Sequence, residues 1–448
     1  MEVVYTIKQN SLRVIRGIEI WLDSESKKLF RNSSWVFFGN LFFVSGVFIQ
    51  SVILGRVFGV ELYGTYLFII YFVETIQEFF NLNVSGALIK FVSEYKSAND
   101  GEKIVAFVKG SLIFAGISGI TSVIAVTSIM AIAYDIFIKQ SGLAIYIIGY
   151  AAGRSLTVLD PISSSLLLVY NKFKLNSTLH VFSSLLELTF IILSIVLFPR
   201  RISTLIIAVI SAKAIGSIFN YGVVAWVFRD KWKRLFCTKM NIIRGQWKEI
   251  REFVLSQSGI RTLKVLISRG DVVLLGMLAG AVQVGYYGVA KKIAFSILLF
   301  TDPLYVSVYP QLSSLVSKQR FNEIKIMLRK ISKILILPMT LFLTLAVLFN
   351  KSIISFVYGN EYITAGKPFV FLLLAVCVAA FFFWLAPLIL SLGLAFFKLK
   401  VDTFVYIIGT GLAFVLTPFY GANGVAIAVL AINILSHSIF LFKVKQYL

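Results

Sequence analysis

Twelve apolar runs dominate the sequence, and each is long enough to cross a lipid bilayer as a helix. A hydrocarbon core about 30 Å thick needs roughly 20 apolar residues in helical conformation, and the backbone inside it must satisfy its own hydrogen bonds. The chain is 58% hydrophobic and 14% charged, whereas soluble domains carry about 25% charged residues. The sequence therefore predicts an all-α polytopic membrane protein rather than a water-soluble enzyme. The predicted spans are 34–58, 62–84, 104–133, 144–169, 178–198, 203–228, 253–278, 284–309, 331–349, 368–393, 401–418 and 423–442.

The basic residues predict how the chain is oriented in the membrane. There are 43 Lys and Arg against 21 Asp and Glu, a formal net charge of +22. Lys and Arg gather in alternate loops, which is typical of the cytoplasmic loops of membrane proteins. This pattern predicts a multi-pass protein of the cell membrane with both termini cytoplasmic, and it explains the charge without a nucleic-acid partner. Residues 1–33 mix apolar and charged side chains, which predicts an amphipathic cytoplasmic segment at the membrane surface.

The sequence divides into two related halves. The most basic loop, 229–252, separates a predicted first six-helix bundle at 34–228 from a second at 253–448. At an offset of 221 residues, Leu54, Gly55, Gly59, Gly64 and Tyr66 match Leu275, Gly276, Gly280, Gly285 and Tyr287. Because each copy holds six spans, both copies have the same orientation, and the substrate site of such parallel repeats lies between them near the middle of the membrane. The sequence thus predicts two pseudo-symmetric six-helix bundles around a central cavity.

Several motifs resemble a known family. The segments 53–64, 86–93, 271–276 with 284–287, and 358–362 are similar in order and spacing to the polysaccharide flippases. These flippases belong to the multidrug, oligosaccharidyl-lipid and polysaccharide exporter superfamily. The sequence departs from many relatives at 81–83, where an acidic residue and a glycine are common, and in having twelve rather than fourteen spans.

The resemblance implies transport, not catalysis. It implies alternating-access movement of a polyprenyl-linked oligosaccharide from the cytoplasmic to the outer leaflet, for surface polysaccharide synthesis. The implied partners are this lipid with its anionic polyprenyl carrier, the membrane lipids, and a glycan polymerase or glycosyltransferases.

A polar stripe marks the span 253–278. Gln257, Arg261, Lys264, Ser268 and Asp271 recur at spacings that place them on one helical face. The 221-residue offset aligns Arg261 with Asn40 and Asp271 with Gln50 in the first span. Since Arg and Lys bind phosphate oxygens, the stripe predicts a cationic cavity for a phosphate or diphosphate. The predicted substrate-binding residues are Arg261, Lys264, Asn40, Gln257, Lys291, Lys292 and Arg154.

Acidic residues in the spans are candidates for gating and for coupling to an ion. Glu74 and Glu78 lie one helical turn apart, so their carboxylates would tend to share a proton. The predicted gating or coupling residues are Asp271, Gln50, Glu74, Glu78 and Asp160.

Internal ion pairing is the competing explanation for the charges in the spans. Asp271 could pair with Arg261 or Lys264, Lys291 with Asp302, and Glu74 or Glu78 with Arg154 or Lys213. Arg269 is expected to extend toward the membrane surface from near the end of its span.

Two other functions remain open. One is a cation-coupled multidrug exporter of the same superfamily, and the other is a membrane-embedded glycan polymerase. The two cysteines, Cys237 and Cys377, and the two histidines, His180 and His437, are isolated in the sequence, so neither a metal site nor a cofactor is predicted. The short outer loops also lack a catalytic constellation, which disfavours an enzyme.

Overall fold

The computed structural model describes residues 24–82, 84–137, 142–229 and 240–447, so most of the predicted segment 1–33 lies outside it. All regular elements in this part of the chain are helical. The first half contains α2 (Ser24–Phe80), α3 (Val84–Ser97), α4 (Gly101–Phe137), α5 (Leu143–Ser155), α6 (Asp160–Val169), α7 (Phe173–Leu197) and α8 (Ile202–Val227).

The second half is divided into more and shorter elements. It contains η1 (Met240–Gln246), α10 (Trp247–Ala279), α11 (Ala281–Ser296), α12 (Leu298–Ser317), α13 (Phe321–Leu348), α14 (Asn350–Tyr358), η2 (Asn360–Ala365), α15 (Gly366–Phe381), α16 (Leu385–Ser391), α17 (Ala395–Tyr420) and α18 (Ala422–Lys445).

The helices supply twelve spans, six in each half. In the described residues, nine helical stretches are long and apolar enough to cross a membrane by length and composition. One of them, 41–80, is 40 residues long and turns sharply at Gly59, so it supplies two spans. The polar helix α10 and the pair α11–α12 supply the other two. The predicted all-α, twelve-helix membrane fold is therefore confirmed.

The same backbone turn occurs at equivalent positions of the two halves. Gly59 has φ 72° and ψ 179°, and Gly280, 221 residues later, has φ 83° and ψ 177°. A positive φ favours glycine because a Cβ atom is strained there. The matched turns reverse the chain between the first two spans of each half, which confirms the internal repeat.

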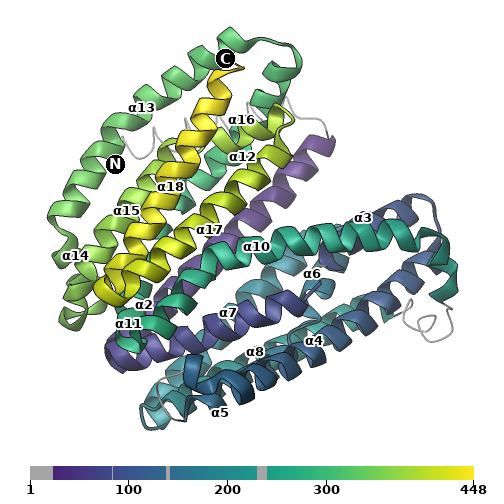
Figure 1. Cartoon of the computed structure of the whole chain (residues 1–448). Coiled ribbons are helices and arrows are strands. Elements are labelled where there is room, and N and C mark those ends of the chain that lie inside the picture. Colours follow the sequence, from purple (N-terminus) through teal and green to yellow (C-terminus); the bar gives the residue numbers. More distant parts are fainter. Residues whose placement is uncertain (1–23, 83, 138–141, 230–239, 448) are drawn as a thin grey trace, which may run out of the picture.

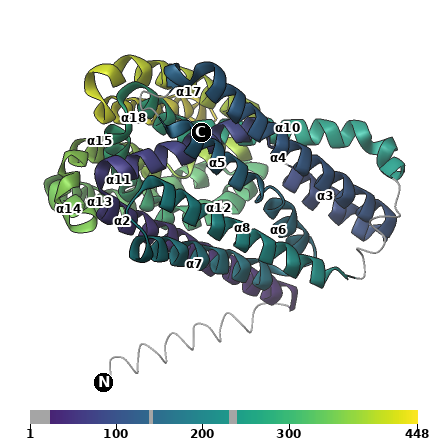
Figure 2. The ribbon, with the colours of Figure 1, turned by 90° about the horizontal axis from the view of Figure 1, so that it is seen from below.

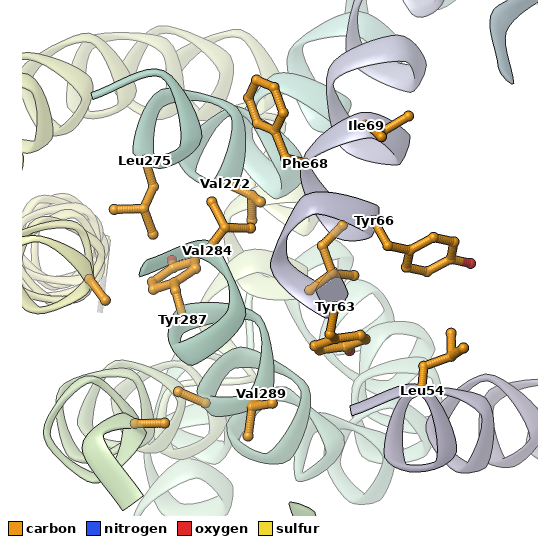
Figure 3. Close-up of a cluster of buried hydrophobic side chains, with 14 of the residues drawn as sticks. Leu54, Tyr63, Tyr66, Phe68, Ile69, Val272, Leu275, Val284, Tyr287 and Val289 are labelled. Carbon is orange, nitrogen blue, oxygen red and sulfur yellow. The ribbon is translucent and has the colours of Figure 1, made fainter. Parts of the chain in front are cut away.

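The two halves meet where α2 crosses α11. A Cβ atom on Gly64 would overlap the carbonyl oxygen of Ala281, and a Cβ atom on Gly285 would overlap the carbonyl oxygen of Val60. These two contacts exchange under the 221-residue offset, so they are related by the pseudo-twofold axis. Figure 3 shows the apolar side chains of α2, α10 and α11 that surround this crossing.

The halves diverge from this meeting point. In Figure 1, α7 and α8 lie in one group of helices and α17 and α18 in the other, and the groups come together near α11 and α14. Figure 2, seen from below, shows α17 and α18 toward one side of the molecule and α7 and α8 toward the other. The C terminus lies at the diverging end. The structure is thus a V whose arms are the two six-helix bundles.

Helix α10 contacts both arms. Near its start, Ile250 and Phe253 pack with α3 and α4 in a core of the first half. Near its end, the hydroxyl group of Tyr406 on α17 donates a hydrogen bond to the carbonyl oxygen of Leu266 at 2.8 Å. The polar stripe of this helix is therefore held between the two halves.

The crossing yields a test of the fold. We expect Gly64→Ala to lower the melting temperature of the purified protein, because the new methyl group must separate two backbones. Overpacking of this kind costs about 1–3 kcal/mol. The matched control is Gly149→Ala, since no atom lies within 4 Å of a Cβ atom built there. An unchanged melting temperature for Gly64→Ala would show that the backbones do not approach this closely.

Candidate substrate cavity between the two halves

A cavity of about 780 Å³ lies between the first half and helices α10 and α11 of the second. Its wall contains five cationic side chains, Arg154, Lys213, Arg261, Arg269 and Lys292. It also contains three carboxylates, Glu74, Asp160 and Glu187. Among the described residues, cations thus outnumber carboxylates in the wall.

Two ion pairs cross between the halves at this cavity. Arg261 Nε on α10 lies 2.5 Å from Glu78 Oε1 on α2, and Arg269 pairs with Glu74. Glu74 also lies 3.2 Å from Arg154 of its own half. The predicted pairing of Glu74 with Arg154 is confirmed, and Glu74 has Arg269 of α10 as a second partner. The ion-pair partner of Glu78 is Arg261 of α10.

A third ion pair joins α10 to the first half outside the spans. Lys90 Nζ on α3 lies 2.8 Å from Glu249 Oε1. The hydrogen bond to this carboxylate raises the pKa of Lys90, although the pair is exposed and contributes little to stability. The three pairs are spread along α10, so this helix is bound to the first half by charge at three points.

Asp271 belongs to a separate cluster. Its Oδ2 atom accepts hydrogen bonds at 2.6 Å from Lys291 Nζ and from the hydroxyl group of Tyr287. Lys291 also donates to the carbonyl oxygen of Ser268. Neither Asp271 nor Lys291 lines the cavity. The anticipated pairing of Asp271 with Arg261 is wrong, because the guanidinium group of Arg261 turns toward Glu78.

The cavity extends into a polar recess of the first half. There Asp160 on α6 accepts hydrogen bonds from Ser217 at 2.7 Å and from Asn220 at 3.2 Å, both on α8. His180 on α7 lies 3.4 Å from the hydroxyl group of Ser164. The recess therefore offers mainly neutral hydrogen-bonding groups.

Three other polar residues complete this side of the cavity. Lys213 Nζ lies 3.5 Å from Glu187 Oε2, which pairs them within the first half. Gln50, in the first span, donates a hydrogen bond to the carbonyl oxygen of Ser184 at 3.2 Å. Together with Asp160, these groups line the first-half wall with hydrogen-bond donors and acceptors.

Lys292 differs from the other cations of the wall. It projects into the cavity from α11 but forms no hydrogen bond or ion pair with any residue that the structure describes. Its ammonium group is therefore available to a ligand.

The remaining predicted substrate-binding residues are placed elsewhere. Lys264 is exposed on α10, and neither it nor Gln257 lines the cavity. Asn40 lies on α2, and its side chain falls outside the described part. Of the predicted substrate-binding set, the cavity brings together Arg261, Lys292 and Arg154.

Arg269 and the recess residues were missed from the sequence. Arg269 was expected to extend to the membrane surface, yet it lines the cavity. Helical spacing gave no signal for Arg269, because it is rotated about 100° from the stripe residue Ser268. His180 appeared isolated because its neighbours Ser164, Asp160 and Asn220 come from other helices.

The second half has its own smaller cavity of about 350 Å³. Ile267 of α10 and Lys398, Asp402 and His437 line it. Lys398 and Asp402 form an ion pair at 2.5 Å. No group of three His, Cys, Asp or Glu suited to a metal ion occurs in the described residues.

Comparison with known proteins extends this description. A family model described as "Polysaccharide biosynthesis protein" matches residues 29–316. No curated protein matches the sequence.

Several solved membrane transporters share the fold. The inward-facing conformation of a multidrug resistance MATE family transporter of the MOP superfamily is 16% identical, with a TM-score of 0.67 over 91% of this chain and 94% of that one. The lipid II flippase MurJ, in an inward closed conformation, is 16% identical, with a TM-score of 0.66 over 93% of this chain and 87% of that one. The outward-facing conformation of a multidrug resistance MATE family transporter is 14% identical, with a TM-score of 0.57 over 94% of this chain and 95% of that one.

These likenesses establish a fold of two helical bundles that occurs in transporters and in a flippase. The family model covers well over half of the sequence, including the whole first half with its recess and the α10 and α11 walls of the cavity. The chain therefore belongs to the polysaccharide biosynthesis protein family, which is the flippase family of the exporter superfamily that its sequence motifs resemble.

Proposed function

We propose that this protein is a flippase for a polyprenyl-phosphate- or polyprenyl-diphosphate-linked oligosaccharide. The observation that carries the proposal is the cavity between the halves, with cationic side chains from both halves and a neutral polar recess beside them. Arg and Lys suit the phosphate groups of such a lipid, and the Ser, Asn and Asp of the recess suit the hydroxyl groups of its sugars. The family and the shared fold with a lipid II flippase support the same function.

The direction of transport follows from the proposed orientation. If the basic loops and both termini are cytoplasmic, the arms of the V diverge toward the cytoplasm. The charged headgroup then enters from the inner leaflet, while the polyprenyl tail stays in the hydrocarbon. Glycosyltransferases that build the glycan, or a polymerase that consumes it, are the proposed partners in the membrane.

A cation-coupled multidrug exporter is the second candidate, and the likeness to MATE transporters favours it. The wall of the cavity argues against it for cationic drugs, because Lys292 has no carboxylate partner among the described residues. We retain ion coupling through Glu74, Glu78, Asp160 or Asp271, with Gln50 as a gating residue, as a proposal for either function.

Loss of the unpaired cation tests the proposed substrate. We expect Lys292→Ala combined with Arg261→Ala to deplete a polyprenyl-linked glycan that co-purifies with the full-length protein, as measured by native mass spectrometry. A charge-assisted hydrogen bond contributes about 1.5–3 kcal/mol, so the loss should be tenfold or more. The matched control is Lys398→Ala, a cation of the second half outside this cavity.

Two results would contradict this prediction. Undiminished glycan in the double variant would place the site elsewhere. The absence of any such lipid from the wild type, together with ion-dependent efflux of dyes, would favour the drug exporter.

The orientation is testable by cysteine labelling in a variant without its two native cysteines. We expect Ser97→Cys, at the end of α3, to react with a membrane-impermeant maleimide only after cells are permeabilised. Arg200→Cys, between α7 and α8, should react in intact cells, because the turn lies at the opposite end of the bundle. Both positions are exposed, so the reverse labelling pattern would invert the proposed topology.

A further inference from the structure

The arginines of α10 are not free in the cavity. Arg261 faces Glu78 and Arg269 faces Glu74, so two of the cations best suited to phosphate are already neutralised by carboxylates of α2. If the proposed function is correct, an anionic headgroup meets these carboxylates as competitors. The exchange between carboxylate and ligand is therefore part of binding.

The burial of the two partners is unequal. The side chains of Arg261 and Arg269 are 33% and 31% exposed, whereas those of Glu78 and Glu74 are 3% and 11% exposed. Both guanidinium groups also line the cavity. The arginines can thus turn toward a ligand in the cavity. Of the two carboxylates, Glu74 also lines the cavity, whereas Glu78 is buried away from it.

Such an exchange would leave the two carboxylates with different numbers of ion-pair partners. Glu74 keeps Arg154 at 3.2 Å when Arg269 turns away. Glu78 has no ion-pair partner besides Arg261 among the described residues, and its Oε1 atom makes no aligned hydrogen bond there. Leaving a carboxylate buried and unpaired is unfavourable. Release of Arg261 from Glu78 is therefore the costlier step.

We propose that Glu74 and Glu78 are specificity-determining residues that occupy the anion sites of Arg269 and Arg261 until a ligand with at least two negative charges replaces them. The unpaired Lys292 gives any anion its first contact. Each arginine then changes partner only if the ligand supplies a negative charge in place of the carboxylate. A diphosphate meets this requirement for both arginines, and a singly charged headgroup does not.

The proposal rests on the proposed function and is tested by binding measurements on the full chain in lipid nanodiscs. The probes are farnesyl diphosphate and the methyl ester of farnesyl phosphate, a monophosphate diester that carries a single negative charge. Binding of these two short soluble prenyl anions is measured by calorimetry. We expect the wild type to prefer the diphosphate. Glu78→Gln should raise the affinity for the monophosphate about tenfold, a typical coupling between linked sites. The preference for the diphosphate over the monophosphate should therefore decrease. Asp402→Asn, which removes an ion pair of the second cavity, should change neither affinity.

A second variant separates competition from structural damage. If Glu78 acts by holding Arg261, then Glu78→Gln should give no gain when Arg261→Gln is already present, which is the test of a double-mutant cycle. An equal gain of affinity in both backgrounds would contradict the proposed competition. It would also be contradicted if Glu78→Gln alone lowered the affinity for the monophosphate or left it unchanged.

The failure of the proposed function would look different. The wild type would then bind neither prenyl anion, and Lys292→Ala would have nothing to weaken. If Lys292→Ala weakened binding but Glu78→Gln did not strengthen it, the proposed flippase cavity would stand and the charge requirement would be wrong.

Discussion

The contact of two backbones at the crossing of α2 and α11 is the constraint on which the rest of the structure depends. Gly64 and Gly285 let each helix approach the carbonyl group of the other, at Ala281 and Val60. Small residues permit such an approach where larger side chains would keep helices apart. Because the halves are held at one end by this contact, their other ends can diverge, and the space between them becomes the cavity.

The wall of that cavity contains several ion-paired side chains. Most ionisable groups in the wall are paired, and the pairs that matter for function join α10 to α2. Ionisable side chains in a membrane normally face the interior of the bundle or water and find partners there. Here the carboxylates are the more buried partners of their pairs, and the arginines border the cavity together with Glu74. Few charges in the wall are therefore unpaired, yet the cations still border the cavity.

The sequence predicted the fold well because its signals are local. Apolar length predicts each span, and the 221-residue offset between Gly59 and Gly280 predicts a repeat whose backbone angles agree. The stripe on α10 led to Arg261, and the clustered lysines led to Lys292. The ion-pair partners could not be predicted in this way. A polar stripe shows which residues share a face of one helix, but not which other helix packs against that face. Arg261 has Glu78 as its partner and Asp271 has Lys291 only because α2, α10 and α11 pack as they do.

The repeat is symmetric in its backbone, but the cavity is not. The polar recess with Asp160, Ser217 and Asn220 belongs to the first half alone, while the second half contributes the arginines of α10 and a separate, smaller cavity. The two copies are therefore not equivalent at the cavity. If the cavity binds the proposed lipid-linked glycan, substitutions in α6, α7 and α8 would change which glycan is accepted, and substitutions in α10 would change how tightly its phosphate groups are held. Such changes would leave the backbone contact at Gly64 untouched, so the recess can be altered without altering the crossing that holds the halves together.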